Sequence, residues 1–559
     1  MTVESAPESN PPRFDLLNDP WIPVIYHDTG STASSGSQLE PRARELSLRA
    51  VFRDAPQVLT LSGEIPTQTF AILRLLLAIL RRSIRDRSGR PTDVWKSLWT
   101  DDALPLAEID QYLDDHKTRF NLFDPVAPFF QVADLRINKG ASTLDVLIAD
   151  VPNGHKYFTS RGGRHMEAIT FAEAARWLVH AQAFDPSGIK SGADGDPRAK
   201  GGRGYPIGVA WTGQLGGIYW EGANLAETLI LNTALAGLDD NPYPKEDKPA
   251  WERPPAGPTV RLDPEPSGPA DLFTWQSRRI RLVAEEKAVT GVVLCNGDPL
   301  EPFNKQRFEP MTAWRFSQVQ TKKSGRDRHY PLTHHVERGL WRSLASLLSQ
   351  GQSKNDRGAP VQPGLVQWAS RLVEDGKLDV TQLIRLHATG MEYVNNQAVV
   401  GEVVDDSLTF RVALLSSDPH LRMCALDAIK TAENSVGILA SLAGDLALAA
   451  GGEPTLARSH ARERGYFILE SSYRRWLAGL ASAADVELYD RNWQEAVRRE
   501  VVRIARELID TAGTPARVGR RIGDRYMDAA RAEGRFFYLL RSALPAAFHR
   551  PVLGKEEKQ

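Results

Sequence analysis

The chain has 559 residues with a formal net charge of −1, and 42% of its residues are hydrophobic and 25% charged. This length predicts two to four domains with well-filled cores. A charge so close to zero excludes a protein that binds nucleic acid through its overall field, so such binding requires local basic patches or a partner already on the nucleic acid. Two cysteines, Cys295 and Cys424, are too few for a disulfide framework and favour a reducing, cytoplasmic setting.

No stretch of the sequence predicts insertion into a membrane. Residues 1–12 are polar and lack the apolar core of a signal peptide. The most apolar window, residues 70–80, contains Arg74 and falls well short of the roughly 20 residues that a membrane span needs. We therefore expect a buried helix at residues 65–84, with its arginines on the exposed side, and no membrane partner.

The N-terminal segment predicts a turn followed by a strand. Asn18-Asp19-Pro20 is a turn signal, and Pro23 is expected to confine the strand after it to a sheet edge. Residues 45–51 predict a return strand or a short helix. His27-Asp28 is a dipeptide of metal-dependent phosphohydrolases, but no second His or Asp follows at a supporting spacing, so we assign it to a loop.

Residues 119–132 gather four aromatic side chains around Pro125 and Pro128. The prolines make this segment a poor helix and a poor continuous strand. We interpret it as a rigid loop whose aromatic side chains pack in the core of the domain.

A basic, glycine-rich region follows. Residues 156–204 hold eight Lys or Arg against five Asp or Glu, a local net charge of +3. Two loops, residues 158–164 and 187–192, flank an amphipathic helix expected at 169–184, and the second loop continues to a basic glycine turn at 200–204. Glycine lets backbone amides approach phosphates or a groove closely, and the neighbouring cations supply charge-driven affinity. Neither loop is a P-loop, and a flexible surface loop is an equally good interpretation.

A second basic region comes after an extended, proline-rich segment at residues 239–269. Alternating apolar residues predict a β-hairpin within residues 275–295. Residues 278–328 hold eleven Lys or Arg against six Asp or Glu, a net charge of +5, and much of that surplus lies in residues 322–328. This run is a plausible but unspecific phosphate contact, because charge runs are usually solvated loops.

Asn395, Asn396 and Gln397 follow one another between two regions that we expect to be helical. Each amide side chain carries both a donor and an acceptor, so on a rigid turn these residues could match base edges or replace the hydrogen bonds of a base pair. A plain turn or a helix N-cap is the alternative, since Asn favours both for local backbone reasons.

The C-terminal part predicts helices. Apolar residues recur at steps of three, four or their sum over residues 421–439, 469–480, 493–508 and 526–540. This pattern predicts four amphipathic helices that form a bundle. We therefore predict an α+β chain with a mixed, loop-rich domain at residues 1–400 and a four-helix bundle at residues 401–559.

The sequence contains no recognisable catalytic set. It holds no zinc-protease helix, Walker lysine or Gly-x-Ser-x-Gly elbow, and no acidic cluster with the spacing of a two-metal nuclease. We predict a binding protein that is not an enzyme and has no metal or cofactor. Two alternatives stay open: a metal-dependent nuclease or phosphohydrolase with a dispersed site, and a scaffold that contacts only protein.

Several segments together resemble a known family. They are residues 14–24 (FDLLNDPWIPV), residues 123–131, the glycine-rich loops and the turn Asn395-Asn396-Gln397-Ala398 before the helical part. In this order and over nearly the whole chain, they resemble the CasA family, the large subunit of the type I-E CRISPR surveillance complex, Cascade. The resemblance implies a mixed N-terminal domain joined to a C-terminal helical bundle.

The resemblance also implies a function. The subunit would recognise the protospacer-adjacent motif in double-stranded target DNA, help to open the duplex for pairing with the guide RNA, and so start R-loop formation. It would then help to recruit the helicase-nuclease that degrades the target. Its partners would be the other Cascade subunits with their crRNA, the target duplex and that helicase-nuclease.

The family's functional residues carry over by position. The glycine loop that reads the motif from the minor groove matches Gly188, Ile189, Lys190, Ser191 and Gly192, and a family lysine on a hairpin falls at Lys287. The strand-separating glutamine wedge matches Asn396, Gln397 and Ala398. The loop that contacts the complex near the 5′ end of the crRNA matches Phe158, Thr159, Ser160, Arg161, Gly162, Gly163 and Arg164. We expect phosphate contacts at Lys200, Arg203, Lys322 and Lys323.

Two departures from the family pattern matter. Some members carry a cysteine cluster beside the hairpin, but only Cys295 stands there in this chain, so we predict no zinc. The loop also holds Ile189-Lys190-Ser191 in place of an uninterrupted glycine run, a difference that bears on how many motifs it tolerates.

Overall fold

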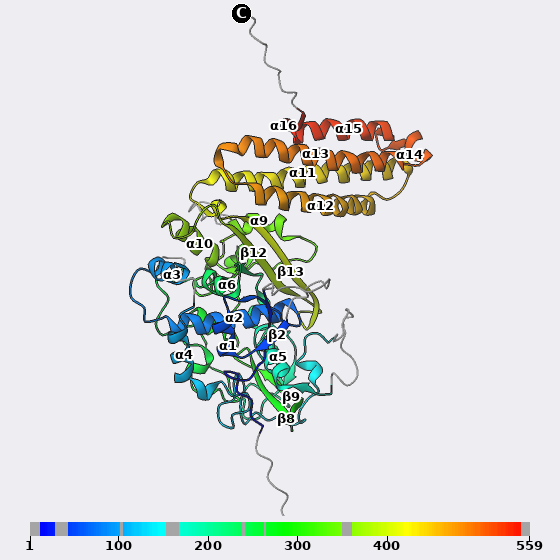
Figure 1. Cartoon of the computed structure of the whole chain (residues 1–559). Helices are drawn as coiled ribbons and strands as arrows, with labels where there is room; N and C mark the ends of the chain where they lie inside the picture. The colour runs from blue at the N-terminus through cyan, green and yellow to red at the C-terminus, as the bar shows by residue number, and fades with distance from the viewer. Residues whose placement is uncertain are drawn as a thin grey trace, which may run out of the picture. The chain divides into compact units, whose positions relative to one another are not determined.

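The computed structural model describes residues 12–27, 43–100, 104–151, 167–237, 241–261, 264–348 and 360–548. The chain combines helices with several small sheets and has a helical C-terminal part, as the sequence predicted (Figure 1). It divides into two compact units. Unit 1 comprises residues 1–338, 349–377 and 385–407, and unit 2 comprises residues 339–348, 378–384 and 408–559. The boundary between independently folding domains at residues 400–401 stays a prediction.

A three-stranded antiparallel sheet opens unit 1. Its strands are, in spatial order, β2 (Ala43–Leu46), β1 (Ile22–Tyr26) and β3 (Val58–Leu61). The prediction that Pro23 confines its strand to an edge is therefore wrong, because β1 lies in the centre. Pro23 lies opposite Glu45 on β2, and its carbonyl accepts a hydrogen bond of 2.9 Å from the Ser62 amide. The sheet thus loses only the N–H that proline lacks.

Helix α2 (Pro66–Ser83) is the buried helix that the apolar window predicted, but its arginines are not exposed. Arg74 is fully buried and pairs with both carboxylate oxygens of Glu309, at 3.0 and 2.8 Å. Arg82 pairs in the same way with Glu252, at 2.7 Å for each contact. A buried charge needs such a partner, since its desolvation is otherwise uncompensated. The predicted exposed arginine face is wrong for this reason.

The sheet that carries the basic, glycine-rich region is built on a long hairpin. Its strands are β8 (Arg278–Glu285), β9 (Ala288–Asn296), β4 (Ile169–Thr170), β5 (Lys190–Ser191) and β6 (Arg203–Gly204). The pairing of β8 with β9 confirms the hairpin predicted within residues 275–295. Helix α5 (Phe171–Phe184) packs against both strands and confirms the predicted amphipathic helix. Thr170 caps this helix by accepting a hydrogen bond from the Glu173 amide.

The amide turn lies at the tip of a β-hairpin and not between two helical regions. The hairpin strands β12 (Leu383–Val394) and β13 (Val399–Arg411) form a sheet with β7 (Gly217–Glu221), in the order β13-β12-β7. β12 pairs with β7 from Arg385 opposite Glu221 to Thr389 opposite Gly217. This partner strand comes from far earlier in the sequence, so tertiary pairing outweighed any local preference for helix.

The aromatic segment lies in the core of unit 1, as predicted. Phe120, Phe129 and Phe130 are buried, and the rings of Phe129 and Phe130 stack with centroids 4.2 Å apart. Among the residues that the structure describes, this unit also contains α1 (Leu48–Asp54), α3 (Pro91–Thr100), α4 (Leu106–Asp115), α6 (Leu225–Leu231), α7 (Pro269–Phe273), β10 (Trp314–Phe316), α8 (Gln318–Ser324), β11 (His329–Pro331) and α10 (Gly364–Glu374).

Unit 2 contains the four predicted amphipathic helices (Figure 1). They are α11 (Pro419–Ala450), α12 (Pro454–Gly479), α13 (Val486–Asp510) and α15 (Ala529–Ala543), and α11 contacts each of the other three. Gly451, with a φ of 89°, ends α11, and Pro454 begins α12. The sequence did not predict the short elements α9 (Leu340–Leu348), α14 (Thr514–Val518), β14 (Arg520–Ile522), β15 (Arg525–Met527) and α16 (Pro545–Phe548).

Candidate nucleic-acid interface

The predicted motif loop starts where α5 ends. The chain leaves the helix at Asp185 and enters β5 at Lys190. Gly188 has a φ of 152°, and a Cβ built on it would meet no atom within 4 Å. Ile189 beside it is 60% exposed. The loop tip is therefore open to a large ligand, and a side chain at position 188 would strain the backbone.

Arg278 holds this loop in place through several hydrogen bonds. Its fully buried guanidinium donates to the Asp185 carboxylate at 2.5 Å. The same group donates to the carbonyls of Asp185, Pro186 and Gly208, at 3.0, 3.1 and 3.0 Å, and to the Ser277 carbonyl at 2.9 Å. Charge-assisted hydrogen bonds of this kind are stronger than neutral ones, and the planar guanidinium directs them into fixed positions. Arg278 thus determines where the chain begins its approach to Gly188.

Replacing Arg278 by Met should lower the free energy of unfolding by about 3–5 kcal/mol, because the change leaves several buried acceptors without a donor. Arg281 on the same strand is the matched control. Its Nε is buried and has no hydrogen-bond partner within the described residues, so Arg281→Met should cost less than about 1 kcal/mol. Urea unfolding of the isolated chain measures both values, and equal losses would refute the special role of Arg278.

Lys190 is not available for phosphate contact in this conformation. Its ammonium lies 2.6 Å from the Asp185 carboxylate, and its side chain is only 13% exposed. Burial lowers the pKa of Lys190, and Asp185 opposes that effect. The loop therefore presents its backbone and Ile189 to solvent, while its one lysine is used inside the fold.

The tip of the β12–β13 hairpin has an unusual backbone. Asn395, Asn396 and Gln397 have φ values of 50°, 57° and 66°, so three successive residues adopt the left-handed conformation. Asn tolerates this conformation better than most residues, whereas a Gln in it is uncommon. All three and Ala398 are exposed. The amide side chains therefore project from a tight turn and have no helix to cap.

The motif loop and the hairpin tip touch one another. The Ser187 amide donates to the Gln397 carbonyl at 2.9 Å, and the Tyr393 hydroxyl donates to the Phe184 carbonyl at 2.6 Å. Burial raises the pKa of Tyr393 well above its ordinary value, so the hydroxyl stays a donor. A cavity of about 430 Å³ is lined by residues of both segments, including Gly188 and Ala398. Two of the predicted site segments thus form one continuous surface.

A basic turn, residues 200–203, adjoins the motif loop. Lys200 and Arg203 are exposed and pair across Gly201 and Gly202, with backbone hydrogen bonds of 2.9 and 3.1 Å. The two glycines have φ values of 57° and 71°, which a two-residue hairpin of this type requires. The Gly192 amide also donates to the Gly202 carbonyl at 2.9 Å. This contact ties the predicted phosphate contacts Lys200 and Arg203 to the end of the motif loop.

Lys287 does not join this surface. It is exposed at the β8–β9 turn, whereas the motif loop pairs with β9 through Ser191 opposite Cys295. From Ala288 to Cys295 the strand advances about 23 Å, at roughly 3.3 Å per residue. Lys287 is therefore not part of the motif loop itself, and its contact with the minor groove from the hairpin turn stays a prediction.

The remaining predicted site residues are Lys322, Lys323 and the loop at residues 158–164. Lys322 and Lys323 are exposed in the last turn of α8, a helix with no buried residue. In the described residues no hydrogen bond or ion pair connects their side chains to the motif loop. The predicted crRNA-end loop, residues 158–164, lies outside the described residues.

The model of the family described as CRISPR-associated protein Cse1 matches residues 15–504. The chain belongs to the Cse1 family. A curated relative, the CRISPR-associated protein CasA/Cse1 of Thermus thermophilus, is 28% identical over 539 residues, which cover 90% of this chain and 94% of the relative. The resemblance to the CasA family is thereby confirmed.

Solved structures of Cse1 proteins have the same fold. Cse1 of Thermobifida fusca is 43% identical, with a TM-score of 0.86, over 96% of this chain and 99% of that chain. Cse1 of Acidimicrobium ferrooxidans is 28% identical, with a TM-score of 0.79, over the same shares of the two chains. A chain of a CRISPR RNA-guided surveillance complex is 18% identical, with a TM-score of 0.64, over 90% of this chain and all of that chain, and shares the fold.

His180 makes the folding stability of this Cse1-family chain depend on pH. It is buried on α5, and its Nε2 lies 3.0 Å from the Thr67 hydroxyl. Burial lowers the pKa of His180 to about 3, and nearby Asp185 opposes the shift only in part. The unfolded chain takes up a proton near pH 6.5 while the folded chain does not, so folding stability is lost as the pH falls below that value.

Between pH 6 and pH 4 this histidine should therefore reduce the free energy of unfolding by about 1.4 kcal/mol per pH unit. His180→Gln, which keeps a polar group for Thr67, should remove that part of the pH dependence. Urea unfolding of both proteins at a series of pH values measures the difference. Parallel stability curves for the two proteins would show that His180 is not buried in its neutral form.

Three residues that position the loop and the hairpin tip, Asp185, Arg278 and Tyr393, were not predicted from the sequence. Asp185 follows the predicted helix directly, and Arg278 lies within residues 275–295, where the hairpin was predicted. A charged residue at the end of an apolar element could have marked Asp185 and Arg278. Nothing in the sequence pairs them, because 93 positions separate Asp185 from Arg278 and 209 separate Tyr393 from Phe184.

The described part of this Cse1-family chain contains no group of three or more His, Cys, Asp or Glu residues with the arrangement of a metal site. Within the same residues, no helix combines the length and apolar character needed to cross a bilayer.

Proposed function

We propose that this Cse1-family chain is the non-catalytic large subunit of a type I-E CRISPR Cascade complex, which recognises the protospacer-adjacent motif in double-stranded DNA. It opens the duplex next to the motif, starts R-loop formation and helps to recruit the helicase-nuclease. The observation that carries the proposal is the hydrogen bond from the Ser187 amide to the Gln397 carbonyl, because it joins a glycine-containing loop to an exposed amide turn. A motif reader next to a strand separator requires such an arrangement.

The chemistry of the two segments suits these tasks. A backbone loop in the minor groove reads a degenerate code, chiefly A·T against G·C, so relaxed motif recognition follows. Inserting the Gln397 side chain between base pairs costs roughly a few kcal/mol of unstacking. Phosphate contacts and then the RNA–DNA heteroduplex offset that cost. We assign the phosphate contacts to Lys200 and Arg203, and a more distant phosphate contact to Lys322 and Lys323.

Because the chain has a net charge of −1, we attribute its affinity for DNA to local cations and to the other subunits of its complex. The other Cascade subunits with their crRNA are the proposed partners, and the cytoplasm is the proposed location. The chain should therefore co-purify with crRNA when it is expressed together with affinity-tagged subunits of that complex. Absence of the chain from the purified crRNA complex would overturn its assignment as a subunit.

Removing the two cations of the basic turn tests the DNA-binding part of the proposal. The variant Lys200→Gln with Arg203→Gln should weaken binding of any duplex by the assembled complex, and should lower the slope of log K against log salt concentration by about 2. Electrophoretic mobility shift at several salt concentrations measures this slope. An unchanged slope would favour a scaffold that contacts only protein, and nicking of DNA by the purified chain with Mg²⁺ would contradict a non-catalytic role.

A further inference from the structure

A cavity of about 450 Å³ in unit 1 lies between the aromatic segment and the proline-rich segment. It is separate from the cavity at the motif loop, since the two share no lining residue. The charged groups among its described lining residues are the cations Arg119, Arg253, Arg261 and Arg279 and the anions Asp271 and Asp298. Their charges sum to +2, so the cavity attracts anions.

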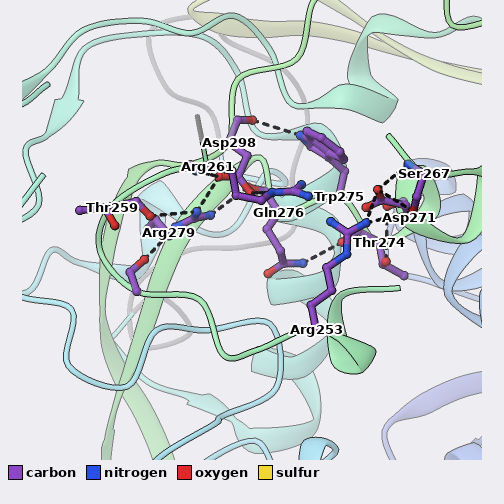
Figure 2. A network of polar contacts seen from close by, with 12 residues as sticks. Arg253, Thr259, Arg261, Ser267, Asp271, Thr274, Trp275, Gln276, Arg279 and Asp298 are labelled. Atoms are coloured by element: carbon purple, nitrogen blue, oxygen red, sulfur yellow. Dashed lines mark hydrogen bonds and ion pairs between the residues drawn. The ribbon is translucent and has the colours of Figure 1, made fainter. Parts of the chain in front are cut away.

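Three of these arginines are held by carboxylates, as Figure 2 shows. Arg253 pairs with Asp271. Arg261 and Arg279 share Asp298, at 2.9 and 2.6 Å, and Arg279 also donates to the carbonyls of Gly257 and Thr259. Burial raises the pKa of Asp298, but Arg279 and Arg261 outweigh that effect and hold its pKa below the ordinary value. These pairs fix the proline-rich segment as one wall of the cavity.

Arg119 has no carboxylate at ion-pair distance among the described residues; burial lowers its pKa, and nearby Asp124 opposes that effect only in part. Its Nη1 donates to the carbonyls of Trp251 and Arg253, at 3.1 and 2.6 Å, and no ion pair holds it among the described residues. Its Nε is buried and has no hydrogen-bond partner there. A buried N–H without an acceptor is unfavourable, so the guanidinium is not fully satisfied by the fold itself.

The cavity also has aromatic lining residues. Phe129, Phe130 and Trp251 line it, and the planes of each pair of these rings lie within 22° of one another. Phe130 has a φ of 56°, which is a strained conformation for a bulky residue. Such strain gathers at ligand sites. Nearly parallel rings next to a guanidinium suit a flat ring that carries an anionic group.

We propose that this cavity binds a nucleoside monophosphate, with the phosphate on Arg119 and the base on the side of Phe130 and Trp251. A phosphate monoester carries a charge of about −2 at neutral pH, which matches the excess of +2. The volume lies within the range of small-ligand sites, roughly 300–1,000 Å³. A free nucleotide and the phosphorylated end of a strand share this chemistry.

Isothermal titration of the full chain with AMP, GMP, CMP and UMP tests the proposal. At least one of them should bind more tightly than inorganic phosphate and more tightly than its own nucleoside. Arg119→Gln should weaken that binding by at least about tenfold, since it removes a charge-assisted contact. Arg136→Gln, which changes an exposed arginine of the same unit, should leave it unchanged.

A second variant covers the case in which Arg119→Gln does not fold. Thr259→Trp adds a bulky side chain at an exposed lining residue and should block binding while circular dichroism shows a folded chain. Competition by a 5′-phosphorylated dinucleotide assigns the ligand to a strand end, and failure to compete assigns it to a free nucleotide; either result keeps the proposal. The proposal is overturned if none of the four monophosphates binds, or if Arg119→Gln and Thr259→Trp both bind as the unchanged chain does.

Discussion

Changing Gly188 to Asp is expected to abolish motif-dependent binding of duplex DNA by the assembled complex. Gly188 has a φ of 152° at an open loop tip, so a side chain there both strains the backbone and occupies the space through which a groove would approach. The carboxylate adds repulsion from the DNA phosphates. We expect a loss of at least about 100-fold in affinity, or about 2.8 kcal/mol, in a mobility-shift assay at physiological salt.

Two variants separate the causes of that loss. Gly188→Ala imposes the backbone strain without the charge and should cost less, about tenfold. Gly376→Asp is the matched control, because Gly376 also has a positive φ, of 64°, and open space around its Cα, but follows α10. It should bind DNA like the unchanged chain. If Gly188→Asp retains its affinity for the motif, the loop does not read DNA.

Removing the amide side chains at the hairpin tip should leave the chain folded and bound to its complex, yet slow strand opening by at least about tenfold. A tenfold slower step corresponds to about 1.4 kcal/mol, which is smaller than the few kcal/mol that unstacking a base step costs. The variant Asn396→Ala with Gln397→Ala makes this change. Permanganate reactivity of thymines next to the motif, followed over time, measures the opening.

Replacing the same two residues by glycine separates the role of the side chains from that of the turn. Asn396 and Gln397 have φ values of 57° and 66°, and alanine in this conformation costs roughly 1–2 kcal/mol per residue. Asn396→Gly with Gln397→Gly keeps the turn and removes only the side chains. Slow opening in both variants supports the side chains as the wedge. Slow opening in the alanine pair alone would assign the effect to the turn.

The sequence predicts best what depends on neighbours along the chain. Helix α5, the β8–β9 hairpin and the four long helices of unit 2 all follow from apolar periodicity, with breaks at residues such as Gly451. The setting of the amide turn was mistaken, because β12 is fixed by pairing with β7, whose residues lie far earlier in the sequence. The edge assignment of Pro23 failed because a proline can occupy a central strand when its carbonyl accepts a hydrogen bond, here from the Ser62 amide.

Within the candidate site, too, the sequence predicts properties of short segments but not contacts between distant segments. Glycine content and local charge pointed to the motif loop and to the basic turn at Lys200 and Arg203, because both are properties of short segments. The use of Lys190 inside the fold depends on Asp185 and Arg278, and only the folded chain brings that cluster together. The distance of Lys287 from the motif loop depends on the direction in which the whole β8–β9 hairpin extends, which no short segment of the sequence specifies.

A photo-crosslinking side chain at position 397 tests the central claim, that the hairpin tip enters the duplex beside the motif. The assembled complex is irradiated with a motif-containing duplex, and the crosslinked nucleotides are mapped. The same group at position 376 is the comparison, because Gly376 follows α10 and a Cβ built on it would meet no atom within 4 Å. Crosslinks from position 397 should fall on the first base pairs next to the motif and disappear when the motif is changed, with none there from position 376. Crosslinks from position 397 to protein alone, or to DNA without regard to the motif, would contradict the claim.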